Sequence, residues 1–256
     1  MKRAKTLLIT GGSSGIGKAT VEVFEAHGWQ VYELSRHGRI ACDVTNPESV
    51  KQAVAKVMNE VEWLDVVISN AGYGISGSIE FTDIEDAKRQ FDVNFFGALN
   101  LTQAVLPYLR KQQGGRLLFT SSVAAVLPIP YQSFYSATKA ALNAYALALQ
   151  NEVRPWGIEV AVLMPGDVQT GFTAARKKEL RGSDIYTHMT AAVERMEKDE
   201  QTGIPAAKIA AIYYHMATRR HLSQQYIGGG EYKIFCFLDR LLPKRLVNWI
   251  VGKLYS

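Results

Sequence analysis

Short apolar runs alternate with segments of helical periodicity along most of the chain. The apolar runs are typical of buried strands and fall at residues 5–10, 30–34, 39–44, 64–69, 115–122 and 158–163. Other segments place apolar residues three and four positions apart, which predicts helices at about 19–26, 47–60, 82–110, 135–154 and 205–220. Six strand–helix units without repeats predict a doubly wound α/β domain, in which helices cover a parallel sheet.

Local signals mark the ends of several predicted helices. Asn46 before Pro47 is a capping residue followed by proline at the first helical position, so a helix begins there. Thr82 and Glu85 have the spacing of a capping box, which opens another helix. Pro155 ends the helix that starts near residue 135, because proline cannot sit inside a helix.

Residues 167–203 form a long insertion after the sixth apolar run. The segment is rich in charge, yet Met189, Ala192, Val193 and Met196 fall at helical spacing on one face. Such a face fits a lid whose apolar side covers a substrate. A surface helix packed on the core explains the pattern equally well.

The last residues, 234–256, form an amphipathic extension to a main domain that we place at residues 1–233. Apolar side chains share one side of this extension, with Lys244, Arg245 and Lys253 nearby. A basic amphipathic helix can lie on a membrane surface or close over a pocket. Most such helices pack on their own domain or on a partner subunit, so we favour packing over membrane contact.

Composition places the chain among globular proteins with enough length for one large core. It has 256 residues, of which 47% are hydrophobic and 21% charged, with a formal net charge of +5. The basic residues are scattered in small groups, and this pattern argues against nucleic acid as a partner. The apolar runs fall short of the ~18 residues that a membrane span needs.

The two cysteines, Cys42 and Cys236, are too far apart in sequence to suggest a disulfide framework or a metal cluster, so we expect no metal site. The chain starts with basic residues and an apolar run, but Gly11 and Gly12 interrupt that run too soon for a signal peptide. We therefore expect a reduced, cytoplasmic protein.

A glycine-rich turn joins the first apolar run to the first helix and reads Gly11-Gly12-Ser13-Ser14-Gly15-Ile16-Gly17. Glycines let the backbone come close to a pyrophosphate. The N-terminus of the following helix adds free amide hydrogens and the positive end of its dipole. Between a first strand and an amphipathic helix, this turn predicts a dinucleotide site.

Ser35 and Arg36 follow the second apolar run, where a dinucleotide fold meets the adenosine ribose. An acidic residue there would accept a hydrogen bond from the 2′-hydroxyl of NAD(H). Arg36 instead suits a 2′-phosphate, which a guanidinium can bind in a bidentate fork. We therefore prefer NADP(H) and keep NAD(H) as the alternative. Arg36 as a mere solvated loop charge is the competing interpretation.

The third apolar run, which ends in Asp43 and Val44 near the expected adenine edge, arrives early. About four residues separate it from the second run, whereas a parallel crossover normally takes a dozen or more. Either a tight extended link replaces the usual helix, or the sequence as given lacks a segment. We expect the adenosine side to be open near His37 and Gly38, and a complete helix between the two strands would contradict this.

Small and polar residues follow two further strands. Asn70, Ala71 and Gly72 come after the fourth apolar run, and Ser122 ends the fifth. Ligands bind at the carboxyl ends of the strands in open α/β sheets, so these residues are candidates for a site. The linker at 123–134 is apolar and is expected to line a pocket next to Ser122.

Tyr135 and Lys139 are four residues apart, so on a helix they share one face. A phenol has a pKa near 10 and is a poor proton shuttle at neutral pH. An ammonium about 4 Å away interacts with its anion by roughly 4 kcal/mol at an effective dielectric of 20, which would lower that pKa. The competing interpretation is an ordinary helix surface, because both residues are common.

Taken together, the ordered motifs resemble the short-chain dehydrogenase/reductase family over roughly residues 5–220. The matching positions are Thr10-Gly11-x-x-x-Gly15-x-Gly17, Asp43-Val44, Asn70-Ala71-Gly72, Asn94, Ser122, Tyr135-x-x-x-Lys139 and Pro165-Gly166-x-Val168-x-Thr170. The resemblance implies a Rossmann-like doubly wound parallel sheet of about seven strands, a nicotinamide cofactor and the interconversion of a secondary alcohol with a carbonyl.

The resemblance also implies a role for each cofactor residue. The pyrophosphate would lie over residues 11–17 and the adenine near Asp43 and Val44. The nicotinamide end would touch two groups of residues, namely Asn70, Ala71 and Gly72 after the fourth run and Pro165, Gly166, Val168 and Thr170 after the sixth.

The catalytic roles follow in the same way. Tyr135 would be the general acid in reduction and the base in oxidation, and Lys139 would hold the ribose hydroxyls and lower the tyrosine pKa. Ser122 would hydrogen-bond the substrate carbonyl oxygen. Asn94 would fix a water that links Lys139 to solvent, whereas on residue type alone a buried Asn more often ties a helix to backbone.

The tail more loosely resembles those of relatives that act on steroids, retinoids or other lipid-like carbonyls. With the apolar linker and insertion, it suggests a bulky hydrophobic alcohol or ketone as the small-molecule substrate. We expect a homo-oligomer, either a dimer or a tetramer. A non-catalytic NADP(H)-sensing protein is the alternative function, but a sensor would be free to lose Ser122, Tyr135 and Lys139, and all three are present.

Overall fold

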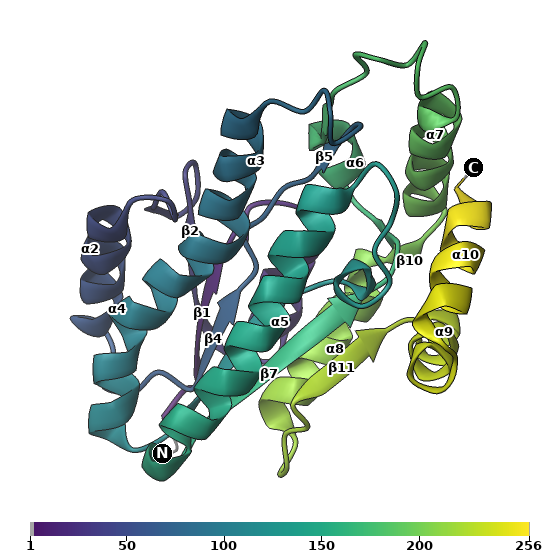
Figure 1. The fold of residues 1–256 in the computed structure, drawn as a ribbon. Helices are drawn as coiled ribbons and strands as arrows, with labels where there is room; N and C mark the ends of the chain where they lie inside the picture. Colours follow the sequence, from purple (N-terminus) through teal and green to yellow (C-terminus); the bar gives the residue numbers. More distant parts are fainter. Residues whose placement is uncertain (1–2, 256) are drawn as a thin grey trace.

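A seven-stranded parallel sheet forms the centre of the molecule, which a computed structural model describes for residues 3–255 (Figure 1). The strand order is β11-β7-β6-β4-β1-β2-β3, and every pair is parallel. The strands are β1 (Thr6–Thr10), β2 (Gln30–Ser35), β3 (Ile40–Ala41), β4 (Val66–Ser69), β6 (Gly115–Thr120), β7 (Ile158–Pro165) and β11 (Gln225–Gly228). The predicted fold class, a doubly wound parallel sheet, is confirmed.

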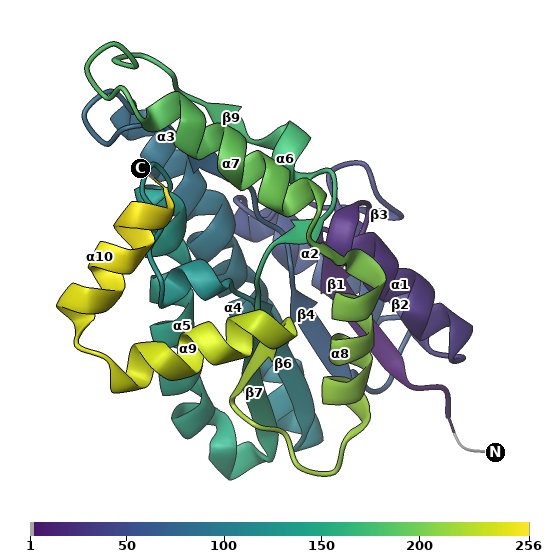
Figure 2. The ribbon, with the colours of Figure 1, turned by 90° about the vertical axis from the view of Figure 1, so that its right-hand side faces the viewer.

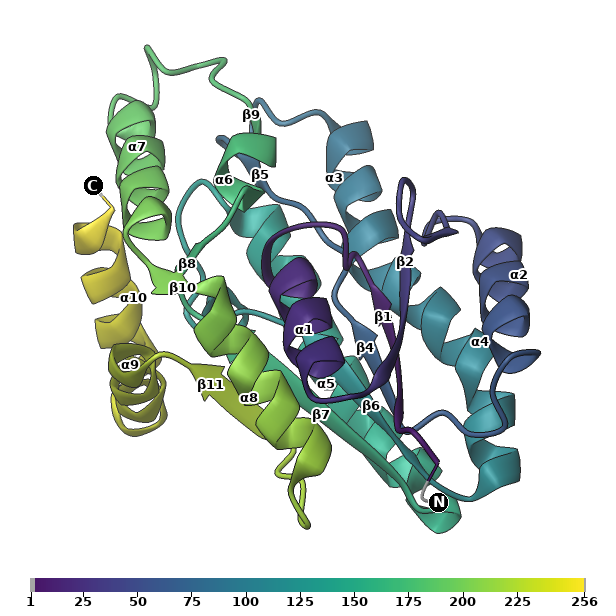
Figure 3. The ribbon, with the colours of Figure 1, turned by 180° about the vertical axis from the view of Figure 1, so that it is seen from behind.

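Helices cover both faces of the sheet. One face carries α2 (Pro47–Met58), α4 (Gly97–Gln112) and α5 (Ser133–Val153), and Figure 3 shows α1 (Gly15–Ala26) and α8 (Ala206–Thr218) on the other. Successive strand residues point to opposite faces. Leu8 thus packs with the first layer, whereas Leu7 and Ile9 pack with the second. Burial on both faces explains why these strands read as continuous apolar runs.

The link between β2 and β3 is the short one that the sequence predicts. Residues 36–39 form a turn, and Ser35 O accepts hydrogen bonds from the amides of Gly38 and Cys42. β3 pairs with β2 over just two residues, so the predicted strand at 39–44 is much shorter than expected. The parallel crossover is therefore made by a turn in place of a helix.

The predicted helix at 82–110 is divided by a π turn. It consists of α3 (Ile84–Phe91), the π turn at Asp92–Phe96 and then α4. The capping box predicted at Thr82 and Glu85 is wrong, because Asp83 occupies the cap position and makes no side-chain cap bond. The cap predicted at Asn46 is confirmed, since its side chain accepts hydrogen bonds from the amides of Glu48 and Ser49.

The insertion at 167–203 builds a small layer above the carboxyl ends of the strands. It holds β8 (Val168–Gln169), α6 (Phe172–Ala175), β9 (Lys177–Lys178) and α7 (Met189–Gln201). β8 pairs with β10 (Ile204–Pro205) and β9 with β5 (Ile75–Ser76). The apolar face predicted from helical spacing is buried, because α7 packs it against Ile129, Tyr131, Tyr186 and Tyr255.

Two helices at the edge of the molecule complete the chain, α9 (Gly230–Leu241) and α10 (Lys244–Leu254) (Figure 2). They follow β11, and α9 begins four residues before the predicted extension. The inner side of α9 packs on the protein, as the burial of Cys236 and Asp239 shows, whereas no residue of α10 is buried. Figure 2 shows that α9 crosses in front of the sheet and α10 runs up towards α7.

Candidate active site

A cavity of about 1460 Å³ lies where the strands end at their carboxyl side. Sites for one small ligand are typically ~300–1,000 Å³, so this cavity has room for a dinucleotide and a second molecule. Every site residue predicted from sequence lines it, except Gly17 and Asn94, which pack behind its wall. The carboxyl ends of parallel strands meet at one edge of the sheet, which explains why residues so far apart in sequence converge.

In the glycine turn, side chains do not cover the backbone of the glycine positions. Gly11 has a φ of 66° and Gly15 a φ of 51°, a left-handed conformation that glycine adopts without strain. A Cβ on Gly11 would come within 2.9 Å of the Cα of Ala71, and one on Gly17 would collide with the carbonyl oxygen of Gly11. Ser14, the cap residue of α1, makes no side-chain cap bond, so it leaves the amides of the first turn available to an anion.

The adenosine end of the cavity combines an unsatisfied hydroxyl with guanidinium groups. Ser35 Oγ is buried and has no hydrogen-bond partner among the residues that the structure describes. Arg36 lines the same end, and so does Arg89, which the sequence analysis missed. Two hydrogen bonds from Thr45 lower the pKa of Asp43, and the positive charges of Arg36 and Arg89 lower it further.

These features fit a dinucleotide that carries a 2′-phosphate. The bare turn and the start of α1 match a pyrophosphate. The orphaned Ser35 hydroxyl and the Arg36 guanidinium match a phosphate on the ribose. Asp43 lines the same cavity, and its Oδ1 accepts hydrogen bonds from the amide and the hydroxyl of Thr45.

Asn70 and Thr120 join the ends of three strands behind the cofactor region. Asn70 Nδ2 donates to the carbonyl oxygen of Gly11 at 3.1 Å, and Thr120 Oγ1 donates to Asn70 Oδ1 at 3.1 Å. Thr120 Oγ1 also bonds the hydroxyl of Tyr213, which is fully buried beneath it. Asn70 therefore has a positioning role in this structure, because it fixes the glycine turn against the end of β4.

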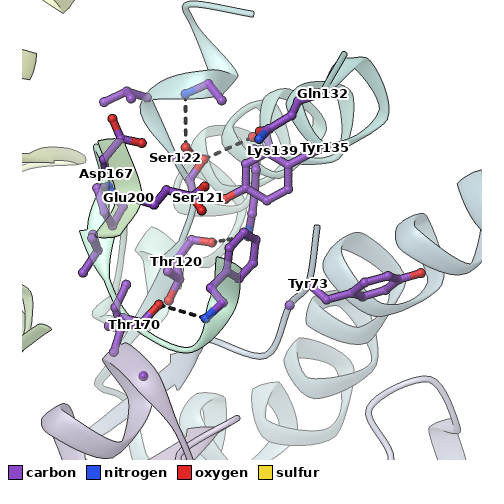
Figure 4. Close-up of a pocket in the computed structure, with 18 of the residues that line it drawn as sticks. Tyr73, Thr120, Ser121, Ser122, Gln132, Tyr135, Lys139, Asp167, Thr170 and Glu200 are labelled. Carbon is purple, nitrogen blue, oxygen red and sulfur yellow. Dashed lines mark hydrogen bonds between the residues drawn. The ribbon is translucent and has the colours of Figure 1, made fainter. Parts of the chain in front are cut away.

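Ser122 starts a short 3₁₀ turn at the end of β6. Its Oγ accepts a hydrogen bond of 3.1 Å from the amide of Ala124. This bond fixes the oxygen and leaves the hydroxyl proton free to point into the cavity. In Figure 4 Ser122, Tyr135 and Lys139 converge on one region of the pocket.

Tyr135 lies on the first turns of α5, where it is half-buried and lines the cavity. Burial raises the pKa of Tyr135 to about 12, because the phenolate loses hydration. A hydrogen bond with Ser122 acts in the opposite direction but does not outweigh burial. Its ring is 5.7 Å from that of Phe172, which comes from α6 in the insertion. The phenol is thus protonated at neutral pH.

Lys139 points its ammonium at a backbone carbonyl instead of at the phenol. Nζ donates to the carbonyl oxygen of Thr120 at 2.8 Å and lies 5.6 Å from the centre of the Tyr135 ring. Burial lowers the pKa of Lys139 to about 8. The predicted lowering of the tyrosine pKa is wrong for the protein alone, because burial disfavours both charged forms and outweighs the other influences on the phenol.

Asn94 sits in the π turn and binds the backbone that follows β4. Its Nδ2 donates to Tyr73 O at 3.0 Å and to Thr138 Oγ1 at 3.1 Å, and its Oδ1 accepts from the amide of Tyr73 at 3.0 Å. Asn94 therefore ties helix to backbone, which is the alternative that residue type alone favours. A Cβ on Gly72 would lie 3.1 Å from Asn94 Oδ1 and 3.6 Å from Lys139 Nζ, so these groups meet at Gly72.

Two carboxylates in the substrate half were missed by the sequence analysis. Asp167 follows β7 and accepts a hydrogen bond from the hydroxyl of Tyr232 on α9. Burial, reinforced by the charges of Glu200 and Asp199, raises the pKa of Asp167 to about 6. Figure 4 shows Asp167 and Glu200 across the view from Tyr135.

Glu200, at the end of α7, connects the insertion internally. It forms a salt bridge with Arg176 and accepts a hydrogen bond of 2.6 Å from Thr173 Oγ1. Arg176 is buried and stacks over Phe172, with 5.6 Å between its guanidinium carbon and the ring centre. This network holds α6 and α7 together above Tyr135. Spacing in the sequence could not reveal it, because the partners are 24 to 27 residues apart.

Comparisons with known proteins agree with this geometry. The family model described as short chain dehydrogenase matches residues 5–181. A 3-ketodihydrosphingosine reductase from Bacteroides thetaiotaomicron is 40% identical over 262 residues, which cover 98% of this chain and 97% of that protein. A probable short-chain type dehydrogenase/reductase from Helicobacter pylori is 30% identical over 250 residues, 92% of each chain.

A solved structure shows the same similarity in three dimensions. The crystal structure of a short-chain dehydrogenase from Streptomyces avermitilis matches with a TM-score of 0.84 and 29% identity, over 94% of each chain. The match spans nearly the whole length, so the two proteins share the architecture of the sheet and of the layer above it.

Proposed function

The chain belongs to the short-chain dehydrogenase family and is an oxidoreductase, and from this premise we propose that it reduces a long-chain ketone with NADPH. The observation that carries the proposal is the convergence of Ser122, Tyr135 and Lys139 on one cavity that also contains the bare glycine turn. A sensor without turnover would have no need of this proton donor in that place.

The state of Tyr135 favours reduction. With a pKa raised to about 12, the phenol stays protonated at pH 7 and can act as a general acid. When bound, the reduced cofactor supplies a hydride to the carbonyl carbon. Tyr135 donates its hydroxyl proton to the carbonyl oxygen, and the hydroxyl proton of Ser122 stabilises the charge that develops there.

Lys139 prepares the site for the ribose. The free-energy cost of burying its charge is incurred on folding, before the cofactor binds. The ammonium donates one hydrogen to Thr120 O and has two further donor hydrogens. Ribose hydroxyls within reach can accept these hydrogens. A positive charge held there favours the tyrosinate left after proton transfer, so Lys139 contributes to the chemical step as well as to binding.

The cofactor preference rests on Ser35 and Arg36. Both line the cavity beyond the end of β2, and Ser35 Oγ lacks another partner among the described residues. A phosphate can accept hydrogen bonds from both groups and brings negative charge to the guanidinium, whereas a 2′-hydroxyl brings no charge. We therefore propose NADP(H) as the preferred cofactor, with NAD(H) used less well.

The substrate class combines a long apolar chain with a basic group near the ketone. Apolar residues of α9 and α10 line one wall of the cavity, among them Leu238, Ile250 and Leu254. Asp167 and Glu200 lie close enough to Tyr135 for their charges to raise its pKa. The Bacteroides relative is named for 3-ketodihydrosphingosine, whose ketone neighbours an amine on a long alkyl chain.

We therefore propose that a long-chain 2-amino-3-ketone is the substrate and that Asp167 accepts a hydrogen bond from its ammonium. Glu200 already has Arg176 and Thr173 as partners, so Asp167 is the better candidate. This narrows the steroid- or lipid-like substrate predicted from sequence to the lipid-like alternative.

The insertion at 167–203 keeps the role of a lid in this proposal. Phe172, Met196 and Glu200 from this segment line the cavity, and the buried face of α7 packs over the linker at 123–134. Such a segment excludes water once both ligands are bound. We also retain as proposals that the protein is a homo-oligomer and that it works in the reducing cytoplasm, where its free buried cysteines stay reduced.

The decisive assay follows the absorbance of the reduced nicotinamide while the purified protein meets NADPH or NADH and 3-ketodihydrosphingosine. The same chain length with the amine replaced by hydrogen serves as the matched control substrate. The proposal predicts turnover that is faster with NADPH and with the amine present. Turnover confined to small polar sugars or to steroids would contradict the substrate class, and no turnover with any carbonyl would support the sensor alternative.

A further inference from the structure

The helices α9 and α10 expose apolar side chains where a helix in water normally places polar ones. Ile234, Phe237, Leu238 and Leu241 follow one stripe of α9 at helical spacing, and Ile234, Phe237 and Leu241 are 60 to 65% exposed. The opposite side of α9 faces the protein, since Cys236 and Asp239 are buried. The apolar stripe of α9 therefore faces away from the protein.

The next helix continues this surface. Leu246, Trp249 and Ile250 are exposed on α10, and Trp249 is 61% exposed. Nine of the fourteen large hydrophobic residues found exposed among residues 3–255 belong to residues 230–254, which we call the terminal hairpin. Such clustering indicates a binding surface, because single exposed apolar residues are normally scattered.

Basic residues outnumber acidic ones on the same two helices. Between residues 230 and 254 the chain has five basic residues and two acidic ones, Glu231 and Asp239. Asp239 is buried and forms a salt bridge with Lys244. Lys233, Arg240, Arg245 and Lys253 remain exposed against one exposed acid, Glu231, so the surface is positive on balance.

We propose that the terminal hairpin docks on the surface of an anionic lipid bilayer. Aromatic and aliphatic side chains with basic neighbours are the composition of helices that lie in a membrane interface. Exposed Trp is typical of that depth, and lysines and arginines add attraction to anionic headgroups. Within residues 3–255 no helix is long and apolar enough to cross a bilayer, so the contact is interfacial.

Charge favours a bilayer over a second copy of the chain as the occupant. Two hairpins packed face to face would bring two surfaces of net positive charge together, and like charges across an interface oppose association. An anionic membrane supplies the opposite charge. The bilayer also accommodates all the exposed apolar residues at once, without a complementary groove.

The same two helices form a wall of the cavity, so docking connects the site with the lipid phase. Leu238, Ile250 and Leu254 line the cavity and are also partly exposed, at 39 to 44%. A long-chain ketone that resides in the membrane can therefore pass from the lipid into the cavity along apolar side chains, without crossing water. This second step rests on the proposed function, whereas the docking itself does not.

Sedimentation with vesicles tests the proposal. Purified full-length protein is mixed, without substrate, with vesicles of phosphatidylcholine alone or of phosphatidylcholine with phosphatidylglycerol. We expect binding to the anionic vesicles that weakens roughly fivefold for each of Lys233, Arg240 and Arg245 changed to Gln, and that falls with added salt. The double variant Phe237→Ser/Leu241→Ser should bind about tenfold less.

A matched control variant separates docking from general stickiness. Ile79→Ser/Ile84→Ser removes two residues that are each 63% exposed but lie outside the hairpin, and it should bind like the wild type. Equal binding by both double variants would overturn the proposal. So would hairpin-dependent dimerisation in light scattering without vesicle binding, which would assign the surface to a second copy.

The reaction is assayed separately to keep the two proposals distinct. Activity of the Phe237→Ser/Leu241→Ser variant on a short, water-soluble aminoketone should equal that of the wild type, because these residues do not line the cavity. Loss of vesicle binding with unchanged activity supports docking. Vesicle binding by a protein inactive on every ketone would leave docking intact and refute the proposed function.

Discussion

Replacing Lys139 with Met should change how the stability of the protein depends on pH. Burial lowers the pKa of Lys139 from 10.5 to about 8, so the charged ammonium destabilises the folded state wherever both states are protonated. At about 1.4 kcal/mol per pKa unit, the cost is roughly 3 kcal/mol at pH 7. As the pH rises above 8, the folded lysine loses its proton while the unfolded lysine keeps it until about 10.5, and the cost disappears.

The Met variant lacks this titration, although it leaves Thr120 O without its hydrogen-bond donor. That loss costs about 1–3 kcal/mol but does not vary with pH. The difference in unfolding free energy between variant and wild type should therefore shift by about 2.5 kcal/mol in favour of the wild type between pH 7 and pH 10. Urea unfolding of both proteins at the two pH values measures the shift. A difference that stays constant would refute the claim that folding removes this ammonium from water.

Three further changes test other parts of the site. Asp167→Asn should raise the KM for the aminoketone roughly ten- to hundredfold and leave the KM for the amine-free ketone unchanged. In the wild type, the KM for the aminoketone should rise as the pH falls through about 6, because Asp167 then takes up a proton. Arg36→Glu should raise the KM for NADPH at least about tenfold but not that for NADH, in initial-rate assays. Asn94→Ala should lower the unfolding free energy by about 1–3 kcal/mol, because the amide of Tyr73 loses its acceptor and Thr138 Oγ1 loses one of its two partners; unchanged urea midpoints would contradict this.

The sheet was predictable because its strands are buried on both faces. Six strands read as apolar runs, and their order along the chain matches a doubly wound topology. The strand β11 escaped notice as a separate run, because Gln225, Tyr226 and Ile227 are only half-buried at the sheet edge. Its residues have no continuous apolar signal of the kind that marks β1 or β4.

The π turn at Asp92–Phe96 has no sequence signal of comparable strength. Its effect is to place Asn94 against Tyr73 and Thr138, which belong to segments distant in the chain. A shift in helical hydrogen bonding of this kind depends on those tertiary partners. The failed capping box at Thr82 has a local cause, since the Thr82 hydroxyl donates to Ser78 O, four residues earlier in the chain.

The site was predictable as a set of residues but not in its electrostatics. Motif spacing identified Ser122, Tyr135 and Lys139, and the structure brings all three to the cavity. The sequence estimate for the tyrosine pKa assumed a hydrated ion pair, whereas Lys139 is buried and Tyr135 is half-buried, and burial raises the pKa of Tyr135 and lowers that of Lys139. Burial is a property of the whole fold, so the direction of the shift could not be read from spacing.

For the terminal helices too, the sequence predicted one part of the arrangement and not the other. Amphipathicity in the sequence favoured packing on the protein. α9 does bury Cys236 and Asp239, but no residue of α10 is buried, and Leu246, Ile250 and Leu254 of the predicted face are exposed. The second apolar face of α9 is visible only once burial is known, because Ile234 and Leu241 have nothing above them among the described residues. Charge and exposure together then point to lipid.

The central claim is that Tyr135 donates the proton in reduction, and single-turnover measurement of Tyr135→Phe with bound NADPH tests it most directly. Phe keeps the ring packing against Phe172 and removes the hydroxyl proton. The account predicts NADPH binding within about twofold of wild type and a rate of ketone reduction lower by about 10²–10⁴-fold. Reduction by the variant at a rate close to that of the wild type would contradict the mechanism.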